Sequence, residues 1–94
     1  MLVKLPDKPV KIPIEGILDL HTFAPKEVKE LIPEYIEECL RVGITEIRII
    51  HGKGTGTLKR IVRSLLEKNP HVEGFSDAEM SGGGWGSTIV HLRR

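Results

Sequence analysis

The feature that most constrains the fold is a strand-and-helix pattern that occurs twice in succession. Residues 16–21 and 46–51 are short β-type segments, and each of them ends on a histidine. Apolar residues then recur at helical spacing over residues 28–40 and again over residues 58–66. Two strands joined by a helix usually lie parallel in one sheet through a right-handed crossover. The pattern therefore predicts an α/β domain.

Two further strands complete the predicted sheet. Residues 72–78 and 87–92 have strand-like composition, and the short connection between them predicts an antiparallel pair. Pro33 lies inside the first helical pattern and is expected to kink or break that helix, because it has no backbone donor. The expected fold is a two-layer α/β sandwich of order βαβαββ with a four-stranded mixed sheet, formed by residues 16–94.

Residues 1–15 are expected to be an extended lead-in, because Pro6, Pro9 and Pro13 disfavour a helix. This segment has no apolar core of a signal peptide, and apolar runs in the chain are far shorter than the roughly 20 residues of a membrane-spanning helix. These features predict one cytoplasmic domain, monomeric and without membrane association. Cys39 is the only cysteine, so it cannot form an internal disulfide and is predicted to be a packed thiol.

Three side chains are predicted to meet at one edge of the sheet. Asp19 and His21 end the first strand, and His51 ends the second. Open α/β sheets bind ligands at the carboxyl ends of their parallel strands. Residues two apart in a strand share a face, so Asp19 can orient His21 as a general base, and the second histidine can act as the acid. A single histidine here more often satisfies loop backbone, whereas three such groups together indicate catalysis.

A glycine-rich turn follows the second strand and leads into the second helix. Its glycines permit positive φ, and the helix that follows offers unpaired N–H groups and the positive end of its dipole. This arrangement predicts a phosphate site, although neither the Walker loop nor the dinucleotide-binding fingerprint is present. The residues predicted to bind phosphate are Gly52, Lys53, Gly54, Thr55 and Gly56.

Basic residues extend the predicted phosphate site along the second helix. They are Lys59, Arg60 and Arg63. The net charge is only +1, but residues 45–69 are basic whereas residues 26–42 are acidic, which indicates a nucleic-acid partner. Trp85 lies in a glycine-rich loop, where it either stacks on a base or folds back over the core.

Three motifs, in this order, resemble the Smr (small MutS-related) domain family. Residues 18–21 (LDLH) resemble its LDxH motif, residues 51–56 (HGKGTG) its HGxGxG motif, and residues 82–88 its glycine-rich loop before the last strand. The resemblance spans residues 17–92 and implies a fold similar to the C-terminal domain of bacterial translation initiation factor three. It also implies an endonuclease that nicks DNA or cleaves RNA. Thr22 departs from the family, which commonly has glycine after LDxH.

Three functional interpretations follow, and the first is favoured. One is an endonuclease that uses Asp19, His21, His51 and Lys53 as catalytic residues. Another is a noncatalytic nucleic-acid-binding module that uses the basic residues alone. The third is a metal site formed by Asp19, His21 and His51, which Lys53 would oppose by its charge. No cofactor is expected, the alternative of a divalent metal stays open, and the sequence does not distinguish DNA from RNA.

On an RNA substrate, the favoured interpretation predicts internal attack. The histidine paired with Asp19 would take the proton of a ribose 2′-hydroxyl, which attacks the adjacent phosphorus. Lys53 would stabilise the charge on the phosphate oxygens, while His51 would protonate the leaving oxygen.

Overall fold

The computed structural model describes residues 1–4, 9–52, 56–78 and 86–94. Its elements, in chain order, are β1 (Leu2–Lys4), β2 (Pro9–Lys11), β3 (Ile17–Asp19), α1 (Pro25–Arg41), β4 (Glu46–Ile50), α2 (Thr57–Lys68), β5 (Val72–Asp77) and β6 (Ser87–Leu92). None of the helices in the described ranges combines the length and the apolar character that crossing a membrane requires.

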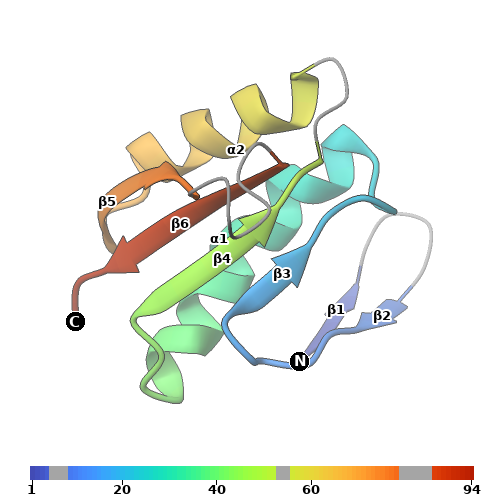
Figure 1. Cartoon of the computed structure of the whole chain (residues 1–94). Coiled ribbons are helices and arrows are strands. Elements are labelled where there is room, and N and C mark those ends of the chain that lie inside the picture. Colours follow the sequence, from blue (N-terminus) through green and yellow to red (C-terminus); the bar gives the residue numbers. More distant parts are fainter. Residues whose placement is uncertain (5–8, 53–55, 79–85) are drawn as a thin grey trace.

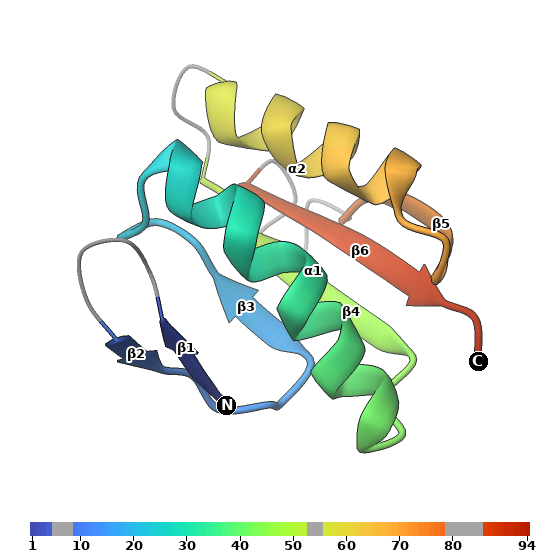
Figure 2. The same ribbon diagram turned by 180° about the vertical axis from the view of Figure 1, so that it is seen from behind.

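The central sheet has four strands in the order β3-β4-β6-β5. Strand β3 is parallel to β4, and β6 is antiparallel to both β4 and β5. Strand β5 therefore runs in the direction of β4, as a crossover through α2 predicts, but β6 lies between them. Both helices cover the same face of the sheet (Figures 1 and 2). The predicted two-layer α/β sandwich with a mixed sheet is thereby confirmed.

The core lies between the sheet and the two helices. In β3, Leu18 is buried between the exposed Ile17 and Asp19, and in β4 both Ile47 and Ile49 are buried. Alternate residues of a strand point to opposite faces, so these buried side chains point toward the helices. Helix α1 contributes the buried Val28, Leu31, Ile32, Tyr35, Ile36 and Cys39. The opposite face of β3 is left to Ile17 and Asp19.

A buried tyrosine fixes the start of β3 against α1. The N–H of Gly16 donates to the Tyr35 hydroxyl (3.1 Å), which donates in turn to the carbonyl of Ile17 (3.3 Å). Gly16 has φ +85°, a conformation that favours glycine. Burial raises the pKa of the neighbouring Cys39 thiol, which is fully buried, and the predicted packed thiol is confirmed.

Helix α1 continues through Pro33, so the expected break does not occur. The helix begins at Pro25, where the missing N–H of a proline removes no helical hydrogen bond. The Glu27 carboxylate accepts the N–H of Ala24 (2.7 Å) and so satisfies a donor at the helix start. Pro33 is exposed, which keeps its ring and the lost hydrogen bond on the solvent side of the helix rather than in the core.

The first residues do more than lead into the domain. Strands β1 and β2 pair in antiparallel fashion and lie beside β3 (Figure 2). The N-terminal ammonium donates to the carbonyl of Ile12 (2.8 Å), and the N–H of Ile12 donates to the carbonyl of Met1 (2.7 Å). Val3 and Ile12 are buried in the common core. The described part of this segment thus forms two short strands and contributes apolar side chains to the packing of the domain.

Helix α2 places only part of its apolar stripe in the core. Val62 and Leu66 are fully buried, whereas Leu58, Ile61 and Leu65 are half-buried, although the helical spacing predicts all five as core residues.

This difference predicts unequal costs of truncation. Leu66→Ala is expected to lower the free energy of unfolding by about 2–5 kcal/mol, as loss of a fully buried leucine does. Leu65→Ala is the matched control and should cost clearly less, because Leu65 keeps part of its surface in water. Urea denaturation of both variants measures the difference. Equal losses would contradict the burial assigned to the two leucines.

Candidate active site

Asp19 and His21 form an exposed pair at the carboxyl end of β3. Leu18 and Leu20 are buried, so the alternation of the strand turns Asp19 and His21 away from the core. The Asp19 Oδ1 lies 2.6 Å from His21 Nδ1 and also accepts the backbone N–H of His21 (3.0 Å). The Asp19 side chain is 46% exposed and that of His21 is 68% exposed. Both groups can therefore reach a ligand in solvent.

The hydrogen bonds of the pair determine which ring nitrogen is available. The backbone N–H of His21, and then its side chain, lower the pKa of the Asp19 carboxyl, so this group is ionised at neutral pH. The carboxylate can only accept, which places the proton of the neutral imidazole on Nδ1. The Nε2 of His21 is then left unprotonated. A carboxylate-oriented imidazole of this kind can act as a general base.

Thr22 follows the pair in an exposed turn, where the N–H of Phe23 donates to the carbonyl of Leu20 (3.0 Å). None of the non-glycine residues in the described ranges has a positive φ. The backbone at Thr22 therefore adopts a conformation open to any residue, and it does not require the glycine that is common in the Smr family.

His51 lies at the neighbouring strand end but is packed differently. The N–H of Leu20 donates to the carbonyl of Ile50 (2.8 Å), which places the ends of β3 and β4 side by side. His51 itself is only 5% exposed. Its Nδ1 lies 3.1 Å from the carbonyl oxygen of Gly52, and its Nε2 lies 2.9 Å from Thr88 Oγ1. Both ring nitrogens therefore contact protein atoms, whereas the spacing predicts a proton donor that faces the ligand.

The partners of His51 define its tautomer. A carbonyl oxygen only accepts, so Nδ1–H donates to Gly52 and the Thr88 hydroxyl donates to Nε2. Burial lowers the pKa of His51, which keeps the ring neutral at neutral pH. His51 thus links the end of β4 to β6 and contacts Gly52, the residue that follows it.

This burial predicts that stability depends on pH. The ordinary pKa of histidine, 6.5, applies to unfolded His51, and the folded value lies below it. As pH falls through about 6.5 and lower, the unfolded chain binds a proton that the folded protein does not, so the free energy of unfolding falls. His51→Gln should reduce this acid-dependent loss, as followed by thermal denaturation at neutral and mildly acidic pH, whereas His71→Gln, at an exposed histidine, should not. An equal acid-dependent loss in the wild type and His51→Gln would contradict the role of His51.

Gly52, the first residue of the glycine-rich turn, is held close to the start of β6. The backbone N–H groups of His51 and Gly52 both donate to the carbonyl of Gly86, at 2.8 and 2.9 Å. A Cβ on Gly86 would lie 3.3 Å from the Gly52 Cα, so a side chain at residue 86 would crowd the turn. Gly52 and Gly56 have φ values of +79° and +84°. Residue 52 therefore needs glycine because of its positive φ, and residue 86 needs it because of the close approach of the two backbones.

The rest of the predicted phosphate turn is only partly placed. Lys53, Gly54, Thr55 and Trp85, which the sequence assigns to catalysis or binding, lie outside the described residues. Helix α2 begins directly after Gly56, and the N–H of Arg60 donates to the carbonyl of Gly56 (3.0 Å). No acidic residue lies in the first turn of α2. The positive end of the helix dipole is therefore not neutralised by that turn.

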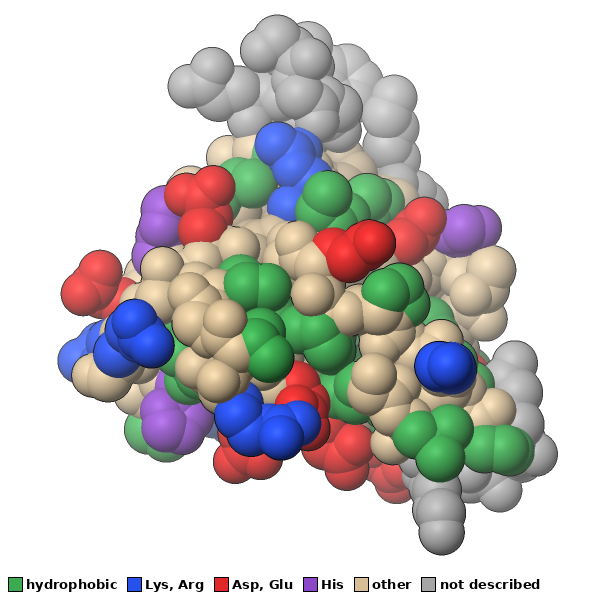
Figure 3. Space-filling view, turned by 90° about the horizontal axis from the view of Figure 1, so that it is seen from below, with side chains coloured by type: hydrophobic (Ala, Val, Ile, Leu, Met, Phe, Trp, Pro, Cys, Tyr) green, Lys and Arg blue, Asp and Glu red, His purple; other side chains and the backbone are tan. Residues whose placement is uncertain are grey.

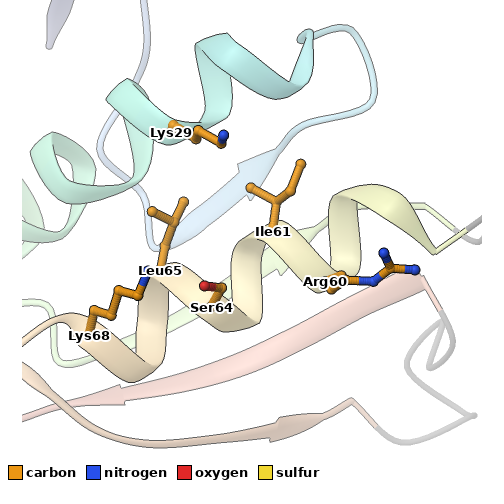
Figure 4. Close-up of a pocket in the computed structure, with 6 residues that line it drawn as sticks. All are labelled: Lys29, Arg60, Ile61, Ser64, Leu65 and Lys68. Atoms are coloured by element: carbon orange, nitrogen blue, oxygen red, sulfur yellow. The ribbon is translucent and has the colours of Figure 1, made fainter.

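The three predicted basic residues of α2 do not form one track. Lys59 Nζ lies 3.0 Å from Asp77 Oδ1, and the guanidinium of Arg63 binds the same oxygen. The Arg63 guanidinium also lies over the ring of Phe75, 5.4 Å from its centre. Arg60 instead lines a groove between α1 and α2 (Figure 4). Residues four apart lie on the same side of a helix, so Lys59 and Arg63 are on one side of α2. Arg60 is on a different side.

Asp77 is a site residue that the sequence did not reveal. Hydrogen bonds from Lys59 and then Arg63 lower the pKa of its carboxyl, so it is ionised and offsets part of their charge. Asp77 pairs with Thr88 in the register of β5 and β6, which places it next to the residue that binds His51. In the sequence, the only sign of Asp77 is an acidic residue near the end of a predicted strand.

The metal site considered from the sequence is not formed by the residues that the structure describes. Within the described ranges, no group of three or more His, Cys, Asp or Glu side chains is arranged as metal ligands. Asp19 and His21 bind each other, while both nitrogens of His51 contact Gly52 and Thr88. These three residues therefore do not fit a common ion.

Comparison with known sequences gives the same family as the motifs. The family model of the Smr domain matches residues 18–93. The chain is 40% identical over 76 residues to Endonuclease MutS2 of Halalkalibacterium halodurans, covering 81% of this chain and 10% of that protein. It is 37% identical over 76 residues to Endonuclease MutS2 of Thermus thermophilus, with the same two coverages. The chain thus spans about a tenth of the length of these curated relatives.

Solved structures agree in fold. The Smr domain of Thermus thermophilus MutS2 superimposes with a TM-score of 0.79 at 36% identity, covering 83% of this chain and 98% of that one. YdaL, a stand-alone small MutS-related protein from Escherichia coli, gives a TM-score of 0.80 at 27% identity, covering 97% of this chain and 72% of that one. Motifs, sequence and fold therefore agree that the chain belongs to the Smr domain family.

Proposed function

We propose that this Smr domain binds nucleic acid and cleaves its phosphodiester backbone, with His21 as the general base. The observation that carries the proposal is the exposed Asp19–His21 pair, whose Oδ1 and Nδ1 lie 2.6 Å apart at the carboxyl edge of the sheet. Two relatives at 37–40% identity are named endonucleases, which supports the same chemistry here.

Each of the neighbouring groups has a separate role in the proposed reaction. Asp19 holds the Nδ1–H of His21, and Nε2 takes the proton of the attacking oxygen. The N–H groups at the start of α2 receive the phosphate, and Lys53 adds positive charge, whereas the N–H of Gly52 is already bound to the carbonyl of Gly86. We assign His51 a positioning role in place of proton donation, because its two nitrogens contact Gly52 and Thr88.

A direct assay tests the proposal. The purified protein is incubated with end-labelled DNA and RNA, with and without a chelator, and the ends of the products are mapped. Cleavage of either polymer that persists in the chelator supports the metal-free role of His21. Binding without cleavage would favour the noncatalytic alternative, in which the basic residues Lys59, Arg60 and Arg63 bind the polymer. Cleavage that requires an added divalent ion would contradict the proposed mechanism.

Asp77 is expected to limit the affinity for nucleic acid. The Asp77 carboxylate offsets the charge of two bases. Its Oδ1 lies 3.0 Å from Lys59 Nζ and also accepts a hydrogen bond from the guanidinium of Arg63. Asp77→Asn should therefore strengthen binding at low salt. It should also steepen the dependence of log K on log salt by about 0.7–0.9, equivalent to one further phosphate contact. Fluorescence anisotropy with a labelled oligonucleotide over a range of salt concentrations measures both effects.

Glu73→Gln provides the matched control for this prediction. Glu73 is an exposed acid on the same strand, β5, and its loss changes the net charge by the same amount. Its effect on affinity should be clearly smaller, because it contacts neither base. Equal effects of the two substitutions would show that only the net charge of the domain matters.

A further inference from the structure

A groove between α1 and α2 combines an apolar floor with a basic rim. It is lined by Lys29, Arg60, Ile61, Ser64, Leu65 and Lys68 (Figure 4). Figure 3 shows the end of the molecule where β3 and β4 begin, and there acidic and basic side chains are interspersed. The groove differs from that surface in its charge. The lining of the groove has three bases and no acid.

The floor consists of two aliphatic side chains that the core leaves partly uncovered. Ile61 and Leu65 lie four residues apart on α2 and point toward α1 (Figure 4). Each is half-buried, although the helical pattern predicts both as core residues. Ser64 beside them is small, so the groove stays open. Burial of such aliphatic surface against a partner would stabilise the complex, because apolar surface is removed from water.

The bases of the rim form no ion pair with the other described residues. Among the ion pairs of the described residues, none involves Lys29, Arg60 or Lys68. Lys59 and Arg63, on the neighbouring side of α2, are by contrast bound to Asp77. The groove therefore offers three cations that are available to an outside partner.

We propose that this groove binds an acidic amphipathic helix of a partner protein. Such a helix lays its apolar face into a groove and uses anchors at helical spacing, for which Ile61 and Leu65 form the matching surface. Acidic residues along its flanks would meet Lys29, Arg60 and Lys68. Arg60 and Lys68 are eight residues apart, which corresponds to about 12 Å along α2, or about two turns of the partner helix.

The composition of the floor favours a protein helix over a nucleic-acid strand. Single-stranded nucleic acid is usually held by aromatic rings on which bases stack, and the lining of this groove has none. The groove is also separate from the proposed catalytic pair, because Asp19 and His21 project from the sheet face that α1 and α2 do not cover. The proposal consequently stands or falls independently of nuclease activity.

A synthetic peptide tests the groove directly. The probe is an amphipathic helix with leucines on one face and glutamates along both flanks, titrated into the full chain labelled with ¹⁵N. The changes in amide chemical shift should concentrate on the residues that line the groove. A peptide of the same composition, shuffled so that leucines and glutamates no longer segregate, should bind at least about tenfold more weakly, because it cannot present both surfaces at once.

Two sets of variants separate the groove from general charge. Lys29→Ala, Arg60→Ala and Lys68→Ala together should weaken peptide binding about tenfold, since all three rim charges are removed. Lys11→Ala, Arg41→Ala and Arg94→Ala make the same change in net charge at exposed positions elsewhere and should leave the affinity unchanged. Leu65→Gln should also weaken binding while circular dichroism shows the domain folded.

Several outcomes would overturn the proposal. These are equal losses in the two triple variants, peptide shifts located outside the groove, and binding of the shuffled peptide as tight as that of the amphipathic one. A short single-stranded oligonucleotide that shifts the groove residues more strongly than the peptide would instead identify the groove as a nucleic-acid contact. Loss of cleavage in His21→Ala, with peptide binding retained, leaves the proposal supported.

Discussion

His21→Ala is expected to slow phosphodiester cleavage by about 10²–10⁴-fold, which is the contribution of a typical general base. In the proposed mechanism the Nε2 of His21 takes the proton, because Nδ1 is bound to Asp19 at 2.6 Å. The His21 side chain is 68% exposed, so folding and affinity for the polymer should stay nearly unchanged. Single-turnover cleavage of a labelled oligonucleotide, with binding measured in parallel, tests both expectations.

Two further variants show whether the pair acts as a unit. Asp19→Asn keeps an oxygen that accepts from Nδ1–H but removes the negative charge, so its rate should fall between those of the wild type and His21→Ala. His71→Ala removes an exposed histidine far along the chain and should leave the rate unchanged. Unaltered cleavage by His21→Ala would remove this residue from the mechanism.

The fold was predictable where the signal is local. Residues 87–92 alternate in polarity, and β6 spans the predicted range, Ser87–Leu92. The two helices follow from apolar spacing in the same way. What the sequence does not encode locally is the pairing of β1 with β2, because it depends on Val3 and Ile12 finding room in a core built by later residues. Pro33 likewise predicts a helix break from its type alone, whereas its exposed position, which depends on the fold, lets α1 continue.

The site was predictable to the same extent. Asp19 and His21 are two residues apart in one strand, so their pairing follows from strand geometry. The burial of His51 depends on Thr88, 37 residues away, and no local pattern indicates that contact. The ion pairs of Asp77 also join separate elements, β5 and α2. The separation of Arg60 from Lys59 and Arg63, however, follows from the 3.6-residue period and was available in the sequence.

An RNA substrate allows the proposed base to work without an external nucleophile. In the proposed reaction on RNA, His21 would take the proton of the ribose 2′-hydroxyl, the 2′-oxygen would form a bond to the adjacent phosphorus, and the bond from phosphorus to the 5′-oxygen would break. The leaving 5′-oxygen would take a proton from water, since the nitrogens of His51 contact Gly52 and Thr88. The expected products are a 2′,3′-cyclic phosphate and a 5′-hydroxyl.

Replacing the single 2′-hydroxyl at the cleaved position by hydrogen should therefore abolish cleavage at that position. The nucleophile is removed, while every phosphate and base that the domain contacts is retained, so binding should be unchanged. The matched control carries the same replacement at the neighbouring nucleotide and should be cut at the normal rate. Gel mapping of end-labelled products, with and without chelator, distinguishes the two substrates. Undiminished cutting at the deoxy position would exclude internal attack and assign the nucleophile to an external water, activated by His21 or by a bound metal ion.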